Sequence, residues 1–374
     1  MKDYIKEIEE YAKICADCGN CLQLCPVYNA ELREPDSPRG KVNLIKELIK
    51  GNIDNNKLNR DFVYRCVLCG SCEYVCTRGI NYIDIMIRYR NLISKEQKIP
   101  KLKKFVLFFY RKEFLRFILP LTDILERTFV KRILPLPKRL KKIKLKIKKD
   151  KNKEYDILIF PGCVLSNFYP DILVKIKNFF EKKGKSVVIP NEFDCCGFPH
   201  LSQGWGKKFD KLKEKNINVL KKYKFKHMVI PCGTGVMTFK KYYNIEDLEV
   251  FELTEYIYRY FKDVKVNIER YENINLSYHH PCHTAKSLGI KEEPEFFLSK
   301  LGDNFKKDDS MLCCGFGGLF SIGYPSTSNK ILDKRVKTFK DMGLDTVLTS
   351  CPGCFFQLRE KTDLNIQHII DLFD

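Results

Sequence analysis

The chain has 374 residues, of which 44% are hydrophobic, so it can bury folded cores and is not a disordered polymer. It also has 17 cysteines, which is too many for packing alone, and a formal net charge of +20. No apolar run approaches the roughly 20 residues that span a bilayer, and the charged N-terminus lacks a signal-peptide core. Because disulfides need an oxidising compartment, we expect a cytoplasmic protein whose thiols are reduced or bound to metal.

Composition divides the chain into three regions. Residues 1–98 contain eight cysteines, residues 99–154 contain none, and residues 155–374 contain the other nine. The segment from Lys101 to Lys153 contains 19 Lys or Arg but only four Asp or Glu, so the basic character of the chain belongs mainly to this segment. We predict a helical ferredoxin-type domain, a basic helical linker and a duplicated α/β domain, in that order.

Two cysteine runs with the spacing C-x2-C-x2-C-x3-C lie in the first region, starting at Cys15 and at Cys66. This spacing is typical of bacterial ferredoxins with two 4Fe–4S clusters, in which the fourth cysteine of each run ligates the other cluster. The predicted ligands are therefore Cys15, Cys18, Cys21 and Cys76 for one cluster, and Cys25, Cys66, Cys69 and Cys72 for the second.

The alternative for these runs is a pair of structural zinc sites with four thiolates each. Zinc usually takes paired C-x2-C knuckles, so the triple with a trailing cysteine favours iron–sulfur. Gly19 and Gly70 would let the backbone approach a cluster closely. A helical stretch at Lys41–Lys50, closed by Gly51, predicts a helical ferredoxin module instead of the compact hairpin type.

The basic segment Ile99–Lys153 has two interpretations. One is an amphipathic helix pair at the inner face of the membrane, with basic residues toward anionic lipid. The other is an interdomain helical linker whose lysines face solvent and whose phenylalanines pack on the neighbouring domains. A redox-sensing nucleic-acid binder is the weakest interpretation, because no recognition helix or aromatic-interleaved groove supports it.

The third region is an internal repeat. Cys163 and Cys282, Cys195 and Cys313, and Cys232 and Cys351 are separated by 119, 118 and 119 residues, respectively. A nearly constant offset indicates duplication. We predict two similar modules, 155–265 and 266–374, in a pseudo-two-fold arrangement.

Each copy has strand-like apolar runs that end at a cysteine. They are Asp156–Cys163 and His227–Cys232 in the first copy, and Asn275–Cys282 and Thr346–Cys351 in the second. Helical patterns such as Tyr169–Lys183 and Ser328–Met342 lie between them. Short strands that alternate with helices predict parallel α/β layers, with the cysteines at the carboxyl ends of the strands, where such sheets place their sites.

The repeat cysteines have metal-like spacing, but the two copies differ. The second copy has five thiols, one more than a cubane needs, and adjacent cysteines hardly fit two corners of one cube. A distorted or larger cluster would use all five. In the first copy Gly235 stands where the fifth cysteine would be, so that site is either a further cluster or a degenerate structural half. The two sets are Cys282, Cys313, Cys314, Cys351 and Cys354, and Cys163, Cys195, Cys196 and Cys232.

Glycines and histidines flank these cysteines. Gly315, Gly317 and Gly318 do not complete a dinucleotide fingerprint, because position 320 is Phe, so we expect them to bring backbone N–H groups to cluster sulfurs. Histidines near the cysteines could donate protons, although hydrogen bonding is the commoner role of such residues. These histidines are His200, His279, His280 and His283.

Taken together, the motifs CGNCLQLCPVY, SPRGKVNLI, CVLCGSCEYVC, CCGFPH, CCGFGGLFS and SCPGC resemble the CCG-domain iron–sulfur family. This family includes the iron–sulfur subunits of glycolate oxidase and of lactate utilisation, and the D-type subunit of heterodisulfide reductase. The resemblance covers all but the basic middle. It implies a non-cubane 4Fe–4S cluster on the five cysteines of the second copy, beside the two ordinary clusters.

The resemblance also implies a function. The chain would relay electrons from a flavoprotein that oxidises a 2-hydroxy acid, such as glycolate or lactate, to a quinone or another acceptor. The alternative is a heterodisulfide reductase-like catalytic subunit that cleaves a disulfide at the non-cubane cluster. No flavin or dinucleotide motif is present, so the flavin would belong to the partner subunit.

Overall fold

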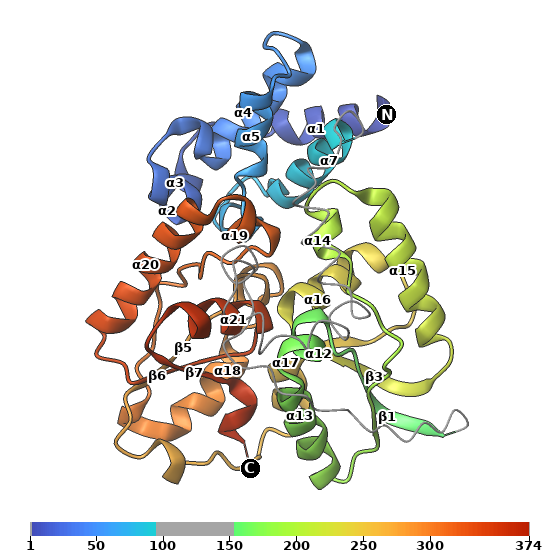
Figure 1. The fold of residues 1–374 in the computed structure, drawn as a ribbon, viewed down its shortest axis with the longest axis vertical. Coiled ribbons are helices and arrows are strands. Elements are labelled where there is room, and N and C mark those ends of the chain that lie inside the picture. The colour runs from blue at the N-terminus through green and yellow to red at the C-terminus, as the bar shows by residue number, and fades with distance from the viewer. Residues whose placement is uncertain (1, 95–152, 374) are drawn as a thin grey trace, which may run out of the picture.

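A computed structural model describes residues 2–94 and 153–373 (Figure 1). The predictions for the basic segment 99–153 therefore lie almost wholly outside the described residues. The N-terminal part is helical throughout its described length, as the ferredoxin-module prediction requires. Its α-helices are α1 (Lys2–Lys13), α2 (Asn20–Leu24), α3 (Pro26–Glu31), α4 (Pro38–Lys50), α5 (Lys57–Tyr64), α6 (Ser71–Tyr74) and α7 (Tyr82–Ser94).

Helix α4 follows directly from its sequence. The Ser37 hydroxyl accepts a hydrogen bond from the Gly40 amide at the N-cap, and Pro38 occupies the first turn. Gly51 ends the helix with a φ of 75°, a conformation that costs glycine little. The helix is longer at its start than the predicted Lys41–Lys50, because the cap and proline extend it by one turn.

The first repeat forms a parallel sheet with the strand order β2-β1-β3-β4. The strands are β1 (Glu154–Ile159), β2 (Val187–Val188), β3 (Lys224–Ile230) and β4 (Val250–Glu252). The helices between and after them are α12 (Cys163–Phe168), α13 (Pro170–Lys182), α14 (Phe198–Leu201), α15 (Gly206–Leu220), α16 (Gly233–Thr238) and α17 (Leu253–Tyr260).

The second repeat forms a smaller parallel sheet with the order β5-β6-β7. Its strands are β5 (Leu276–Tyr278), β6 (Thr346–Thr349) and β7 (Asn365–His368), and its α-helices are α18 (Glu292–Leu298), α19 (Leu319–Gly323), α20 (Pro325–Asp341) and α21 (Pro352–Lys361). A single parallel bridge between Leu276 and Phe305 lies where the first sheet has β2. The predicted parallel α/β layers are present in both copies, whereas the pseudo-two-fold arrangement stays a prediction.

Strand bounds are shorter than the apolar runs suggested. β5 ends at Tyr278, four residues before Cys282, and β6 ends two residues before Cys351. The His279 amide still donates to the Leu348 carbonyl over 2.8 Å, and the residues that follow carry the cysteines beyond the strand ends. The sequence therefore located the strands correctly but extended them into the loops.

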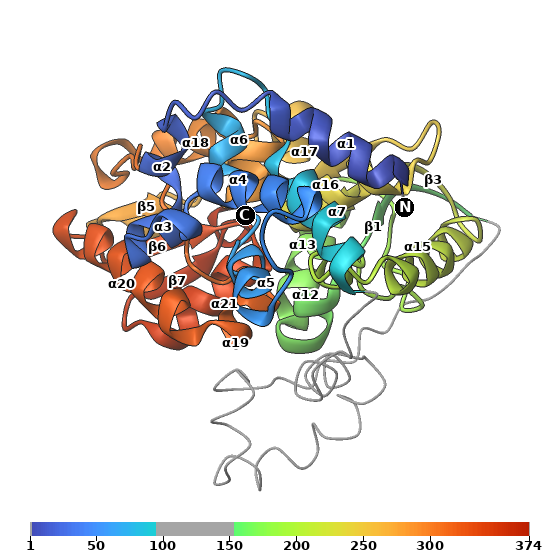
Figure 2. The ribbon, with the colours of Figure 1, turned by 90° about the horizontal axis from the view of Figure 1, so that it is seen from above.

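The N-terminal helices lie across one end of both repeats (Figures 1 and 2). Thr327 of α20 donates a hydrogen bond to Glu31 over 2.7 Å, and Tyr324 donates to Asp61 over 2.8 Å. On the other side, Arg90 of α7 donates to the Ser202 carbonyl over 2.7 Å. These contacts hold the ferredoxin-type helices against the strand ends, where the cysteines of both repeats lie.

Candidate metal centres

One thiol of the first cysteine run meets three thiols of the second run beside α3 and α6. They form the inner cysteine set, which lines a cavity of about 30 Å³ and consists of Cys25, Cys66, Cys69 and Cys72. Burial raises the pKa of Cys72, and the neighbouring thiols raise it further. The cavity gathers the interleaved set that ferredoxin spacing predicts, not the four sequential cysteines of one run. Ligation itself stays a prediction.

The other predicted set lies nearer the surface. This outer cysteine set consists of Cys15, Cys18, Cys21 and Cys76. Cys18 is exposed, Cys21 is buried, and the Cys15 Sγ lies 3.6 Å from Asp17 Oδ1. Burial raises the pKa of the Tyr82 phenol strongly, and the thiols of Cys21 and Cys15 are the next causes. Tyr82 therefore lies close to the outer set and also lines the inner cavity.

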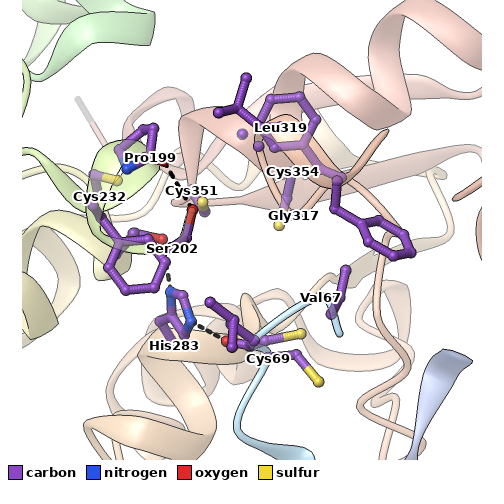
Figure 3. Close-up of a pocket in the computed structure, with 18 of the residues that line it drawn as sticks. Val67, Cys69, Pro199, Ser202, Cys232, His283, Gly317, Leu319, Cys351 and Cys354 are labelled. Atoms are coloured by element: carbon purple, nitrogen blue, oxygen red, sulfur yellow. Dashed lines mark hydrogen bonds between the residues drawn. The ribbon is translucent and has the colours of Figure 1, made fainter. Parts of the chain in front are cut away.

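A larger cavity of about 170 Å³ lies between the two repeats and the N-terminal helices; we call it the chamber (Figure 3). A dry protein cavity of roughly 150 Å³ admits a benzene-sized ligand, so the chamber has room for a small group. Ten cysteines from all three parts of the chain line it: Cys66, Cys69, Cys163, Cys196, Cys232, Cys282, Cys313, Cys314, Cys351 and Cys354. Apolar side chains such as Phe198, Phe316 and Leu319 fill the remaining walls.

All five cysteines predicted for the second repeat line the chamber. Cys314 Sγ and Cys354 Sγ are 3.3 Å apart, and the Gly315 amide donates to Cys313 Sγ over 3.3 Å. Gly315 has a φ of 80°, and a Cβ there would lie 2.5 Å from the Ser328 carbonyl oxygen. This glycine thus brings a backbone N–H to a thiol, as the sequence predicted for the glycine run.

The first-repeat set is gathered less completely. Cys163 Sγ and Cys195 Sγ are 3.7 Å apart, and Cys195 does not line the chamber although the other three do. A Cβ on Gly235 would lie 4.0 Å from Cys232 Sγ. A fifth cysteine at position 235 would therefore lie beside the four cysteines of the first repeat. The Cys232 thiol also hydrogen-bonds Cys351 of the second repeat, which lowers the pKa of Cys351. The two repeat sites therefore open into one chamber, which the sequence did not reveal.

Three of the candidate histidines, His279, His280 and His283, are held in hydrogen bonds, and the ring of the fourth, His200, packs against Trp205 with the ring centroids 5.9 Å apart. His283 lies between Thr234 Oγ1, 2.8 Å from Nδ1, and the Leu68 carbonyl oxygen, 2.7 Å from Nε2 (Figure 3). Because a carbonyl can only accept, Nε2 carries the proton and Nδ1 accepts from Thr234. His280 Nε2 lies 2.9 Å from Glu295, and Arg335 donates to His279 Nδ1 over 3.2 Å.

The donor set fits iron–sulfur clusters. All 17 cysteines lie in the described residues and are free thiols. Soft thiolates select iron–sulfur clusters, zinc or copper(I), and the interleaving of the inner set favours the first of these. His279 Nδ1 or Nε2 also lies within 4.8 Å of the Cys314 and Cys354 thiols, which makes it a candidate extra ligand that spacing did not identify.

Comparisons with known proteins agree with this arrangement. The cysteine-rich domain CCG matches residues 157–240 and again 276–359, and the 4Fe-4S dicluster domain matches residues 11–80. The chain is a CCG-domain iron–sulfur protein. The CCG-domain repeat predicted from constant offsets is thus confirmed, and the protein is an iron–sulfur oxidoreductase subunit.

Relatives cover almost the whole chain at low identity. The B-type subunit of the fumarate reductase (CoM/CoB) of Methanothermobacter marburgensis is 24% identical over 96% of this chain and 71% of its own. The glycolate oxidase iron–sulfur subunit of Escherichia coli is 23% identical, covering 98% and 95%. The D-type subunit of the heterodisulfide reductase of Methanosarcina mazei is 24% identical, covering 96% and 92%. All three relatives are subunits of oxidoreductases.

None of the helices described at 2–94 and 153–373 combines the length and apolar content needed to cross a bilayer. The expected cytoplasmic location and the membrane contact of 99–153 stay predictions.

Proposed function

We propose that this CCG-domain protein is the electron-transfer subunit of an FAD-linked dehydrogenase complex for a 2-hydroxy acid such as glycolate or lactate. It receives electrons from the flavoprotein and delivers them to a quinone or another acceptor. The similarity to glycolate oxidase iron–sulfur subunits along nearly the full length of both chains supports this choice. When bound, each iron–sulfur cluster supplies one-electron redox chemistry.

The observation that carries the proposal is the continuity of the thiol sets. The outer set reaches the surface at Cys18, whereas the inner set is partly buried, and two of its thiols, Cys66 and Cys69, also line the chamber. At that junction the thiols of Cys69 and Cys282 hydrogen-bond, and this contact raises the pKa of Cys69. The cysteines that we predict as ligands of successive clusters thus follow one another from the surface at Cys18 to the chamber, and this order supports a relay.

The test is reduction by a partner. The anaerobically purified full chain is mixed with a glycolate- or lactate-oxidising flavoprotein and the hydroxy acid, and the clusters are followed by electron paramagnetic resonance. We expect cluster reduction only when flavoprotein and hydroxy acid are both present. If the iron-loaded chain remains oxidised with both, the hydroxy-acid assignment is wrong.

The chamber itself favours a second candidate. It is largely apolar, large enough for a small organic group, and lined by thiols of both repeats. A heterodisulfide reductase-like subunit would accept a disulfide there, which two electrons and two protons convert to two thiols. The name of the Methanosarcina mazei relative specifies a CoB–CoM heterodisulfide.

A thiol titration separates the two functions. Addition of coenzyme M or coenzyme B thiol to the oxidised, iron-loaded chain produces a cluster-centred paramagnetic signal if the chamber binds this substrate. A Phe316→Trp variant, which narrows the apolar wall, would weaken that signal. No response to either thiol contradicts the reductase function and leaves the relay as the better supported one.

A further inference from the structure

Three cationic side chains surround the inner cysteine set inside the protein. Lys41 and Arg90 are only 2% and 1% exposed, and Lys286 of the second repeat is partly buried beside α6. Lys41 lines the cavity of the inner set, and Arg90 donates to the Cys66 carbonyl over 2.8 Å. Lys286 donates to Ser71 Oγ, which lies 3.2 Å from Cys69 Sγ. The positive charges are thus close enough to the inner set to influence a cluster bound there.

Two of these charges lack a carboxylate partner in the described part of the chain. Arg90 donates to the carbonyls of Val63, Cys66 and Ser202 over 2.7–3.3 Å, as well as to the Tyr64 carbonyl. Carbonyl dipoles satisfy its hydrogens without neutralising its charge.

Lys286 resembles Arg90 in this respect. Its Nζ donates to Ser71 Oγ over 2.7 Å and to the Met311 carbonyl over 3.0 Å. These neutral acceptors satisfy its hydrogens without neutralising its charge.

The third charge, Lys41, is only partly offset. Its Nζ lies 3.9 Å from Asp36 Oδ1, but the Asp36 carboxylate also accepts from Arg33 over 2.5 Å. The two cations share one carboxylate, so Lys41, Arg33 and Asp36 together carry one net positive charge. The carboxylate near Cys72 is Glu73, which accepts from the Ile83 amide over 2.7 Å. The surroundings of the inner set thus carry an excess of positive charge.

The outer set has a different environment. Asp17 lies beside Cys15, and the nearby Arg39 is paired with Glu34 over 2.7 Å. Cys18 is exposed, so water and salt screen these charges. Interior charges interact more strongly, because the effective dielectric constant is lower there.

From this contrast we infer that Lys41, Arg90 and Lys286 hold a cluster on the inner set at a higher reduction potential than one on the outer set. A reduced cluster carries one more negative charge, which nearby cations stabilise. Burial alone would act in the opposite direction, because it disfavours the more highly charged state. The three cations around the inner set, with Asp36 and Glu73 as the opposing carboxylates, outweigh it.

The difference in reduction potential sets the direction of electron transfer between the two sets. One electron that enters at the outer set moves downhill to the inner set, so the outer cluster is oxidised as the inner one is reduced, and no bond or proton is exchanged. The electron then lies next to the chamber. This inference rests on the proposed function, because it requires iron–sulfur clusters on both sets.

The test is a potentiometric titration of the iron-loaded full chain, followed by electron paramagnetic resonance. A Cys18→Ser variant changes one ligand of the outer set and so identifies its signal. In the native protein we expect the inner signal to appear at the higher potential. The reverse order would overturn the inference.

Charge variants test the cause. In Lys286→Gln we expect the reduced-to-oxidised ratio of the inner cluster at a fixed potential to fall about tenfold, which is about 59 mV for one electron. Lys286→Arg keeps the charge and should restore the native midpoint, and Arg39→Gln should leave the inner midpoint unchanged. If Lys286→Gln does not fold, Lys41→Gln replaces it.

The outcomes separate a failure of the proposed function from a failure of the inference about the cations. A preparation without iron and sulfide at either set contradicts the proposed function. A preparation with native iron content and an unchanged inner midpoint in the charge-removing variant contradicts only the role of the cations.

Discussion

Arg335 and Asp308 form an ion pair in the interior of the second repeat, with Arg335 0% and Asp308 5% exposed. Arg335 also donates to Ser310 Oγ over 2.9 Å and to His279, and its guanidinium lies 4.0 Å from the centroid of the Phe339 ring. A buried pair contributes little net stability, but the loss of one partner leaves an uncompensated charge. The pair therefore fixes the position of His279 near Cys314.

We expect Arg335→Met to lower the free energy of unfolding by about 3–5 kcal/mol, because Asp308 remains buried without its cation. Urea unfolding of the full chain measures this. Lys334→Met removes an exposed lysine one position away and should change stability little. Equal effects of the two substitutions would show that the buried pair is not the cause.

Asp156 gives a pH-dependent prediction. The backbone amide and hydroxyl of Ser186, with Lys226, lower the pKa of Asp156 from 3.8 to about 2. Because the folded pKa is the lower one, the stabilisation is fully present above pH 4 and is lost as the pH falls toward 2. Asp156→Asn should therefore destabilise the chain at pH 5 and less so near pH 2.5. Unfolding curves at both pH values test this, with the exposed Asp263→Asn as control; an equal loss at both would contradict it.

At the scale of elements, the loop after α14 lies tightly against α7. Gly204 has a φ of 74°, and a Cβ there would be 2.2 Å from the Arg90 carbonyl carbon. The Ser94 hydroxyl donates to the Gly204 carbonyl over 2.6 Å. This close backbone contact joins the ferredoxin-type helices to the first repeat, and any side chain at 204 would separate them.

Gly204→Ala should therefore destabilise the chain by more than the roughly 1 kcal/mol expected for a positive φ alone. Gly184→Ala is a matched control, because Gly184 has a φ of 75° and open space around its Cβ position. Thermal unfolding of both variants measures the difference. If the two variants lose the same amount of stability, the close contact between α7 and the first repeat does not contribute to the free energy of unfolding.

At the scale of the whole molecule, the two cysteine runs exchange one cysteine between their sites. Cys25 belongs to the first run by sequence, but it lines a cavity with three thiols of the second. The same exchange is predicted to give Cys76 to the outer set. Cluster assembly would then require both runs to be folded together, since neither run supplies four ligands to one site.

This exchange predicts the pairing of mutant effects. Cys25→Ala should remove the same paramagnetic signal as Cys66→Ala, and Cys76→Ala the same one as Cys15→Ala, with about four iron atoms lost per chain in each case. Iron and sulfide analysis with electron paramagnetic resonance measures this. Should Cys25→Ala instead match Cys15→Ala, each run would hold its own cluster and the exchange would be wrong.

The sequence was sufficient to predict the helical N-terminal module, the CCG duplication, four of the parallel strands (β1, β3, β5 and β6) and the thiols that gather at the inner cavity. These features depend on local periodicity and on short-range ligand spacing, which the order of residues records directly. Strand ends were predicted too late, because apolar residues continue into the loops that carry Cys282 and Cys351. The basic segment lies beyond what the structure describes.

Only the tertiary structure decided that the thiols of both repeats face one chamber, and that Cys69 and Cys232 meet cysteines of the second repeat there. It alone placed Lys41, Arg90 and Lys286 around the inner set. Such contacts join residues up to about 200 positions apart, as Cys69 and Cys282 are. They depend on how finished elements pack against one another, and no local pattern encodes that packing.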